Sequence, residues 1–336
     1  MPRFVTLAVA EVLAARPGLQ RVRLEDGSRA YVLTELIGAV AVGDPVVVNT
    51  TAVDLDLGTG GWHVVHWNLS REGWSSPGGG HVLKVRYTSL QTDVGVAEEG
   101  GGAGGPVPAQ VPVVVCDLHS QVGVVAAAHA ASAPGRRLVY VMTDSAALPL
   151  ALSDLVAGLK ERGHLAATVT AGQAFGGDYE AVNLHTAIQV AAGPATADAV
   201  VVGPGPGTVG TGTPLGFGSL DALTAIEAAI RAGCVPIVAV RWSDADARER
   251  HQGVSHHTAT VLAFTPWTAW VPYPANEAVP DELLPERHHV VPVAETPLEL
   301  EIDVGSMGRG PDEDPGYFRW SAVAGVLAAR VLSNAP

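Results

Sequence analysis

Cysteine is scarce in this sequence, and so are long apolar runs. The 336 residues include only two cysteines, Cys116 and Cys234, and no C-x-x-C pair. Because both adjoin apolar segments, we predict buried thiols in a reducing compartment, and neither disulfides nor a redox pair. The apolar stretch near the N-terminus is interrupted by Glu11, and no run approaches the length of a membrane span. We therefore expect a cytoplasmic protein with no membrane partner.

Positive charge is scarce as well. The chain has 20 Lys and Arg against 34 Asp and Glu, a formal net charge of −14. A field of this sign repels phosphate backbones and anionic lipids, which disfavours nucleic acid and membrane surfaces as partners. It does not exclude a small anionic ligand in a locally basic pocket. The segment from Arg21 to Arg86 is less acidic than the rest, so nucleic-acid processing through this segment stays open as a third hypothesis.

Glycine, in contrast, is concentrated at residues 98–109, EEGGGAGGPVPA, which predicts a flexible linker. Before it, residues 1–97 contain short β-branched segments separated by turn signals such as LEDGS. This pattern predicts a small N-terminal β-barrel of the SH3 or OB kind. We expect Trp62, Trp67 and Trp74 to fill its interior. Residues 110–336 are predicted to form an α/β ligand-binding domain.

In residues 110–336, short apolar runs such as VPVVVCD and CVPIVAVRW alternate with helical patterns. Strands that are apolar throughout, each followed by a helix, predict an α/β fold with a doubly wound, mostly parallel sheet. Beyond residue 262 we expect edge strands and a helix that either packs on the domain or forms a dimer. The sequence therefore leaves a homo-oligomer open.

Polar or glycine-rich segments follow each of the five predicted strands, where ligands bind in doubly wound sheets. We predict a ligand site at this edge. The candidates are Asp117 and His119, Asp144, Asp178, the glycine-rich loop, and then Arg241, Arg248, Arg250, His251, His256 and His257. Helix capping is the competing interpretation for Asp144 and Asp178, and also for Ser120 and Ser255. Capping does not explain why histidines and arginines gather at the same edge.

The glycine-rich loop GPGTVG at 205–210 formally matches G-x-G-x-x-G. Pro204 and Pro206 have no N–H to offer a pyrophosphate, and no Walker lysine is present, so a nicotinamide cofactor is disfavoured. The loop still offers donors to a phosphate or carboxylate. These donors are the N–H groups and hydroxyls of Gly207, Thr208, Gly210, Thr211, Gly212 and Thr213. A tight turn made for close packing is the alternative.

A divalent metal is a further candidate. His256 and His257 are adjacent, so on a helix they point about 100° apart and do not easily face one ion. Asp117, His119 and His256 would instead form a mixed site for zinc or manganese. Alternatively, one histidine is a general base that Asp117 or Asp144 orients.

Several segments together carry a resemblance to a known family. They are GHVLKVRYTSLQ, LHSQV, VMTDSAALPLALSD, AFGGDYEAVN, VGPGPGTVGTGTPLGFG and DARERHQGVSHHT, between about residues 20 and 262. In these the chain resembles an uncharacterised bacterial family, catalogued as domain of unknown function 3866. The resemblance implies no activity, substrate or catalytic residue.

From the residues themselves we expect a hydrolase or transferase that acts on a small anionic metabolite. The glycine-rich loop and Arg241, Arg248 or Arg250 would hold the anion. His119 or His256 would move protons, with Asp117 or Asp144 orienting the imidazole or joining a metal. The alternative is a non-catalytic metabolite-binding or regulatory protein whose barrel contacts a partner.

Overall fold

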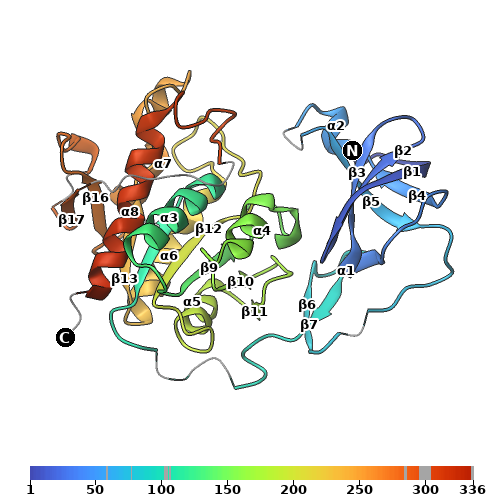
Figure 1. The fold of residues 1–336 in the computed structure, drawn as a ribbon, viewed down its shortest axis with the longest axis horizontal. Helices are drawn as coiled ribbons and strands as arrows, with labels where there is room; N and C mark the ends of the chain where they lie inside the picture. The colour runs from blue at the N-terminus through green and yellow to red at the C-terminus, as the bar shows by residue number, and fades with distance from the viewer. Residues whose placement is uncertain are drawn as a thin grey trace. The chain divides into compact units, whose positions relative to one another are not determined.

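The computed structural model describes residues 1–57, 60–76, 78–101, 105, 107–283, 286–294 and 304–333. The chain divides into two compact units, Met1–Gly95 and Val96–Pro336 (Figure 1). The second unit starts ahead of the predicted linker, and its Ala97 N–H donates to the Glu180 carbonyl. Residues 102–104 and 106 of that linker lie outside the described residues.

The first unit is built around a closed five-stranded barrel. Its strands are β1 (Phe4–Arg16), β2 (Leu19–Leu24), β3 (Arg29–Leu33), β4 (Pro45–Asn49) and β5 (Trp62–Asn68). They follow the order β1-β2-β3-β5-β4, and β3 and β5 are the parallel pair. The other elements are α1 (Thr34–Ile37), α2 (Thr51–Asp54), β6 (Val82–Lys84) and β7 (Thr92–Val94). The predicted small β-barrel is confirmed.

The interior of the barrel is aliphatic, and the tryptophan prediction is largely wrong. Valines such as Val22, Val46 and Val48 form the core with leucine, isoleucine and alanine. Trp67 packs against this core, but Trp62 stacks on Tyr31, with ring centroids 4.8 Å apart. Trp74 is exposed. Small β-branched side chains suffice because a five-stranded barrel has a narrow interior.

The second unit contains one eight-stranded sheet in which every neighbouring pair is parallel. Its order is β11-β10-β9-β12-β8-β13-β16-β17. The strands are β8 (Pro112–Cys116), β9 (Leu138–Thr143), β10 (Ala167–Ala171), β11 (Tyr179–Ala181), β12 (Ala199–Pro204), β13 (Val235–Ala239), β16 (Trp270–Pro274) and β17 (His289–Val293). The predicted α/β fold is confirmed, and β11 is a strand that the sequence did not reveal.

Two sets of helices cover the two faces of this sheet (Figure 1). One set is α3 (His119–Ser132), α4 (Asp154–Glu161) and α8 (Pro315–Ser333), and the other is α5 (Leu184–Ala192), α6 (Ala222–Arg231) and α7 (His256–Phe264). Alternate strand residues divide between the two cores: Val113 and Val115 join α5, α6 and α7, whereas Val114 and Cys116 join α3, α4 and α8. Burial on both faces explains why the strands are apolar throughout.

The C-terminal part of the chain adds an edge strand to the sheet and a helix to one of the two helical layers. β17 lies at an edge, as predicted for this region. α8 packs closely against α3, and Gly325 permits this because a Cβ there would overlap the Val125 carbonyl oxygen. Among the described residues, no helix has both the length and the apolar character that crossing a bilayer requires.

Candidate functional site

The carboxyl ends of β8 and β13 lie side by side, and the chain leaves them toward opposite faces of the sheet. Cys116 of β8 pairs with Ala239 of β13. After β8 the chain enters α3, and after β13 it reaches α7 on the other face. Ligands bind at such switch points in doubly wound sheets. Asp117 and Arg241 follow the two strands at this point.

Thr258 of α7 connects Asp117 to Arg241, and no pattern in the sequence had indicated this role. Its hydroxyl donates to Asp117 Oδ2 at 2.7 Å and accepts the Arg241 backbone N–H at 3.1 Å. All three residues are buried. Burial raises the pKa of Asp117 to about 6, although the Thr258 hydrogen bond and the charge of Arg241 both act to lower it. Burial also lowers the pKa of Arg241, against the opposing charge of Asp117. The site therefore holds two opposite charges that are costly to bury.

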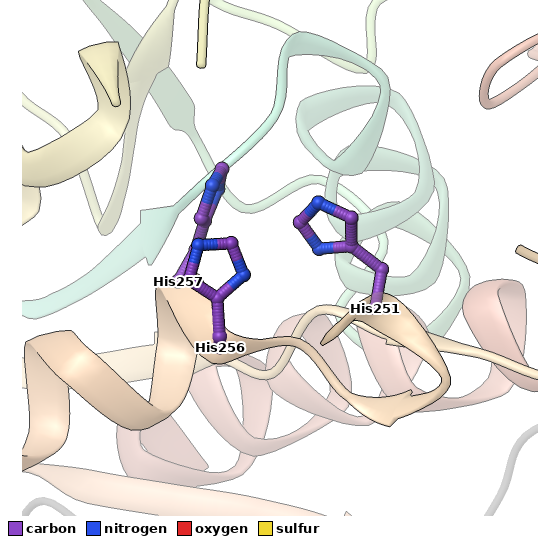
Figure 2. Close-up of side chains that lie close together, drawn as sticks. All are labelled: His251, His256 and His257. Carbon is purple, nitrogen blue, oxygen red and sulfur yellow. The ribbon is translucent and has the colours of Figure 1, made fainter. Parts of the chain in front are cut away.

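Three imidazoles gather beside Arg241, and we name His251, His256 and His257 the histidine cluster. Figure 2 shows His256 and His257 next to each other at the start of α7, with His251 facing them from the preceding loop. Their ring centroids are 4.4 to 5.0 Å apart. One nitrogen from each residue lies within 4.8 Å of the other two. The expectation that His256 and His257 do not converge is therefore wrong.

Ser255 organises this cluster as the cap of α7. Its Oγ accepts the His257 N–H at 3.2 Å and lies 2.7 Å from His251 Nδ1. The loop returns over the site because β14 (Trp242–Ser243) and β15 (Gly253–Val254) pair as a short antiparallel hairpin. Ser255 is thus a helix cap, as the competing interpretation held, and it also positions a histidine.

Burial keeps the histidine cluster neutral. It lowers the pKa of His251 to about 3 and that of His257 to about 2, and the charge of Arg241 acts in the same direction. Burial also lowers the pKa of His256, against the opposing effect of the Arg250 backbone carbonyl. Neutral imidazole is the form that accepts a proton or binds a metal. These three residues could therefore hold a metal ion.

The nitrogens of the cluster have different partners. Arginine can only donate, so Arg241 Nη1 donates to His257 Nδ1 at 3.0 Å. Both nitrogens of His256 are shielded from solvent, and neither meets hydrogen-bond geometry with an atom of the described residues. A buried polar atom without a partner costs about 1–3 kcal/mol. His256 is therefore the member of the cluster best placed for a ligand.

The segment after β12 touches the cluster through Gly210 of the glycine-rich loop and through Phe217, which follows it. Phe217 stacks on His257, with centroids 3.9 Å apart and planes 6° apart. A Cβ on Gly210 would lie 3.7 Å from His257 Nε2, so the backbone of the loop passes close to this ring. The hydroxyls of Thr211 and Thr213 form a hydrogen bond with each other, with their Oγ1 atoms 2.8 Å apart. The remaining predicted anion ligands on this loop are Gly207, Thr208 and Gly212, and their role stays a prediction.

The three predicted arginines differ in how their charges are balanced. Arg248 is paired with Asp246, to which its Nε and Nη2 donate at 2.9 and 2.8 Å. This pair holds the pKa of Asp246 well below its usual range. Arg250 is exposed. Arg241 is buried, and none of the ion pairs found among the described residues involves it. Of the three, Arg241 is thus the buried charge without a direct counter-ion.

His119 does not join the histidine cluster. Its Nε2 lies 2.7 Å from Ser153 Oγ and its Nδ1 lies 3.0 Å from the Pro204 carbonyl oxygen, with the Tyr140 hydroxyl nearby. Burial lowers its pKa to about 4. Both nitrogens are occupied in joining α3 to the start of α4 and the end of β12. The expectation that His119 joins His256 in one metal site is therefore wrong, and its role as the alternative to His256 in moving protons stays a prediction.

The other predicted acids bond to the backbone. Asp144 Oδ2 accepts the Gln173 N–H at 2.8 Å, which links the segments after β9 and β10. Asp178 accepts from Lys160 at 2.6 Å and from the Thr168 N–H at 2.9 Å. Thr168 lies near the start of β10, so Asp178 lies at the amino edge of the sheet. Its predicted place at the carboxyl edge is wrong, because β11 is parallel to β10 and the chain must first return.

Asp221 is a partly buried acid that the sequence interpretation missed. Burial raises its pKa, although the hydroxyls of Thr143 and Ser145 lower it. Its charge in turn raises the pKa of Asp117. The available signal was an acidic residue just before a predicted helix, in a loop that follows a strand.

The family model described as "Protein of unknown function (DUF3866)" matches residues 29–325, which is most of the chain. A search of curated proteins returns no match.

Proposed function

The chain belongs to the family described as DUF3866, and from its structure we propose that it is an enzyme of the hydrolase or transferase type that acts on a small anionic metabolite. The reaction takes place where β8 and β13 end. The observation that carries this proposal is the buried Arg241, which has no carboxylate in an ion pair among the described residues and lies beside Asp117 and the histidine cluster.

Arg241 is the residue that we assign to the anion. Burial of an arginine without a direct counter-ion is costly, and an anionic group of the substrate would offset this cost through charge-assisted hydrogen bonds. Arg248 has its donors on Asp246, so we assign it to the loop and not to the ligand. The backbone of Gly210 passes close to the His257 ring, and we place this part of the glycine-rich loop against the substrate.

Asp117 and His256 are the residues that we assign to proton transfer. The pKa of Asp117, raised by burial to about 6, lies near neutrality, where a carboxyl group can act as a general acid or base. His256 has shielded nitrogens without hydrogen-bond partners among the described residues. His119 is a structural residue in this scheme. We also retain a cytoplasmic location, which suits the two free and buried cysteines.

Anion binding at Arg241 can be measured by calorimetry with inorganic phosphate and malonate as probes. We expect Arg241→Met to weaken binding about 10- to 100-fold, the worth of one or two charge-assisted hydrogen bonds. Arg231→Met is the matched control, because Arg231 is an exposed arginine that pairs with Glu227 on α6. The control should bind like the unaltered protein. Equal affinity of the Arg241 variant would refute the assignment.

Turnover separates an enzyme from a metabolite sensor. We would assay p-nitrophenyl phosphate and p-nitrophenyl acetate, whose hydrolysis is coloured, with the unaltered protein and with His256→Ala. Slow hydrolysis that the variant lacks, at an unchanged melting temperature, supports an enzyme. Anion binding without hydrolysis of either ester favours the non-catalytic metabolite-binding or regulatory protein.

A further inference from the structure

The histidine cluster gathers three metal-ligand side chains that the sequence assigned differently. The predicted metal set was Asp117, His119 and His256. Of these, His119 has both nitrogens engaged elsewhere, and Asp117 accepts from Thr258. His251 and His257 replace them beside His256. We propose that His251, His256 and His257 bind one divalent transition-metal ion of the zinc type.

The chemistry of the donors decides the class of ion. Three imidazoles without a thiolate suit zinc, cobalt, nickel or copper, whereas magnesium and calcium require oxygen ligands. Three protein ligands also leave a coordination position open, as in catalytic zinc sites, and a water molecule or the anionic substrate fills it. This catalytic use of the ion rests on the proposed function. With the ion bound, the lone pair of His256 is engaged, so Asp117 alone keeps the proton-transfer role.

Ser255 prepares His251 for this role. Its Oγ lies 2.7 Å from His251 Nδ1. When Nδ1 donates to Ser255, Nε2 keeps its lone pair for the metal. A hydrogen bond from the second ring nitrogen is the usual way in which proteins fix the tautomer and orientation of a metal-bound histidine. Ser255 also caps the helix that carries the other two ligands, so one hydroxyl orders all three.

His256 and His257 reach the ion by different routes. Both nitrogens of His256 are shielded from solvent, and apart from the Arg250 backbone carbonyl no group of the described residues acts as a hydrogen-bond partner for them, so metal binding satisfies a buried ring nitrogen. His257 Nδ1 accepts from Arg241, and its ring is held by stacking on Phe217. The metal and the guanidinium compete for this lone pair. Metal binding through Nδ1 therefore releases Arg241 toward an anion beside the ion.

Metal titration of the full chain tests this proposal without a substrate. The protein is stripped with a chelator and titrated with Zn²⁺ by calorimetry and with Co²⁺ by visible absorption. We expect one equivalent per chain, with the strong visible bands of a four-coordinate cobalt site. His256→Ala should weaken binding by at least about 100-fold, more than the 10- to 100-fold loss that follows removal of a residue behind the ligands.

Two further variants sharpen the test. His289→Ala, at an exposed position of β17, is the matched control and should leave the affinity unchanged. Arg241→Met removes the competitor for His257 and should tighten Zn²⁺ binding. If a variant does not fold, the unaltered protein still tests the proposal. The proposal is overturned if the unaltered protein does not bind Zn²⁺ at a saturable one-to-one site. Equal affinity of a folded His256→Ala variant would overturn it too.

The outcomes also distinguish this proposal from the proposed function. Phosphate binding is measured on the metal-free and on the zinc-loaded protein. If phosphate binds and zinc does not, the metal site is wrong and the anion site stands. If zinc binds with one equivalent and phosphate binds neither form, the metal site stands and the anion site is wrong.

Discussion

Replacing Asp117 with asparagine should stabilise the protein near neutral pH and abolish its function. The carboxyl group of Asp117 is buried, and burial raises its pKa from 3.8 to about 6. Each pKa unit corresponds to about 1.4 kcal/mol, so keeping this group ionised in the folded state costs about 3 kcal/mol. The attraction to Arg241 is already contained in that pKa. Asparagine keeps an oxygen that can accept from Thr258 and carries no charge.

The sign of the pH dependence follows from proton binding. Between pH 4 and 6 the folded protein binds more protons at Asp117 than the unfolded chain does, so this group contributes stability at low pH that is lost as the pH rises through that window. The Asp117→Asn variant has no carboxyl group at this position and would show no such loss. We therefore expect equal stability of the two proteins near pH 4. Above pH 6.5 the variant should gain up to about 3 kcal/mol over the unaltered protein.

Urea unfolding at pH 4.0 and 7.5, followed by tryptophan fluorescence, measures this difference. The barrel is the same in both proteins, so its transition is common to both. Asp312→Asn, at an exposed position, is the matched control and should show no pH-dependent gain. A variant that is less stable than the unaltered protein at pH 7.5 would refute the reasoning. So would a gain of equal size at both pH values.

Two other predictions test the placement of loop and edge residues. Gly205→Ala should lower the free energy of unfolding of the sheet unit by about 1–3 kcal/mol, because its Cβ would lie 2.6 Å from the Ala147 carbonyl oxygen. A Cβ at Gly212 meets open space, so Gly212→Ala is the control and should change this free energy by no more than about 0.5 kcal/mol. Thermal unfolding compares the two, and equal melting temperatures would contradict the packing. Asp178→Asn removes a half-exposed ion pair with Lys160 and should cost about 1 kcal/mol or less. Phosphate affinity should not change, since Asp178 lies at the opposite edge of the sheet, and a loss of affinity would contradict that position.

Hydrophobic patterning was sufficient to predict the fold, because both faces of the large sheet are buried. Val113 and Val114 face different cores, which makes the strand apolar without a break and identifies a parallel sheet. The barrel was predictable from its turn signals, whereas the prediction that its tryptophans fill the interior was largely wrong. Trp62 has an outward position on β5, where Tyr31 and arginine side chains stack on it. Residue size alone does not show on which face of a strand a side chain lies.

The candidate site was only partly predictable, for two physical reasons. The first is that a strand can be too short to recognise. β11 has three residues and is parallel to β10, so the chain returns to the amino edge before it, and Asp178 directly precedes it there. The second is that proximity along an edge does not decide which face a side chain takes. His119 turns toward α4, while Asp117, two residues earlier, turns toward Thr258 on α7. Strand alternation would place residues two apart on one face, but β8 ends at Cys116 and α3 begins at His119, so the alternation does not extend to this pair.

The arrangement of charges explains why an acidic protein carries a basic, histidine-rich loop. Arg248 and Arg309 both lie within ion-pair distance of the buried Asp246, and Arg309 also pairs with Asp314, so two carboxylates balance the two arginines. Arg241 is left with a neutral histidine as its hydrogen-bond partner and a buried acid at longer range. A fold selected for stability alone would place a carboxylate against that guanidinium or replace it, since breaking or omitting one partner of a buried pair is costly. A buried guanidinium without a direct ion pair, beside three neutral imidazoles, is instead the expected arrangement where a further negative charge arrives with a ligand.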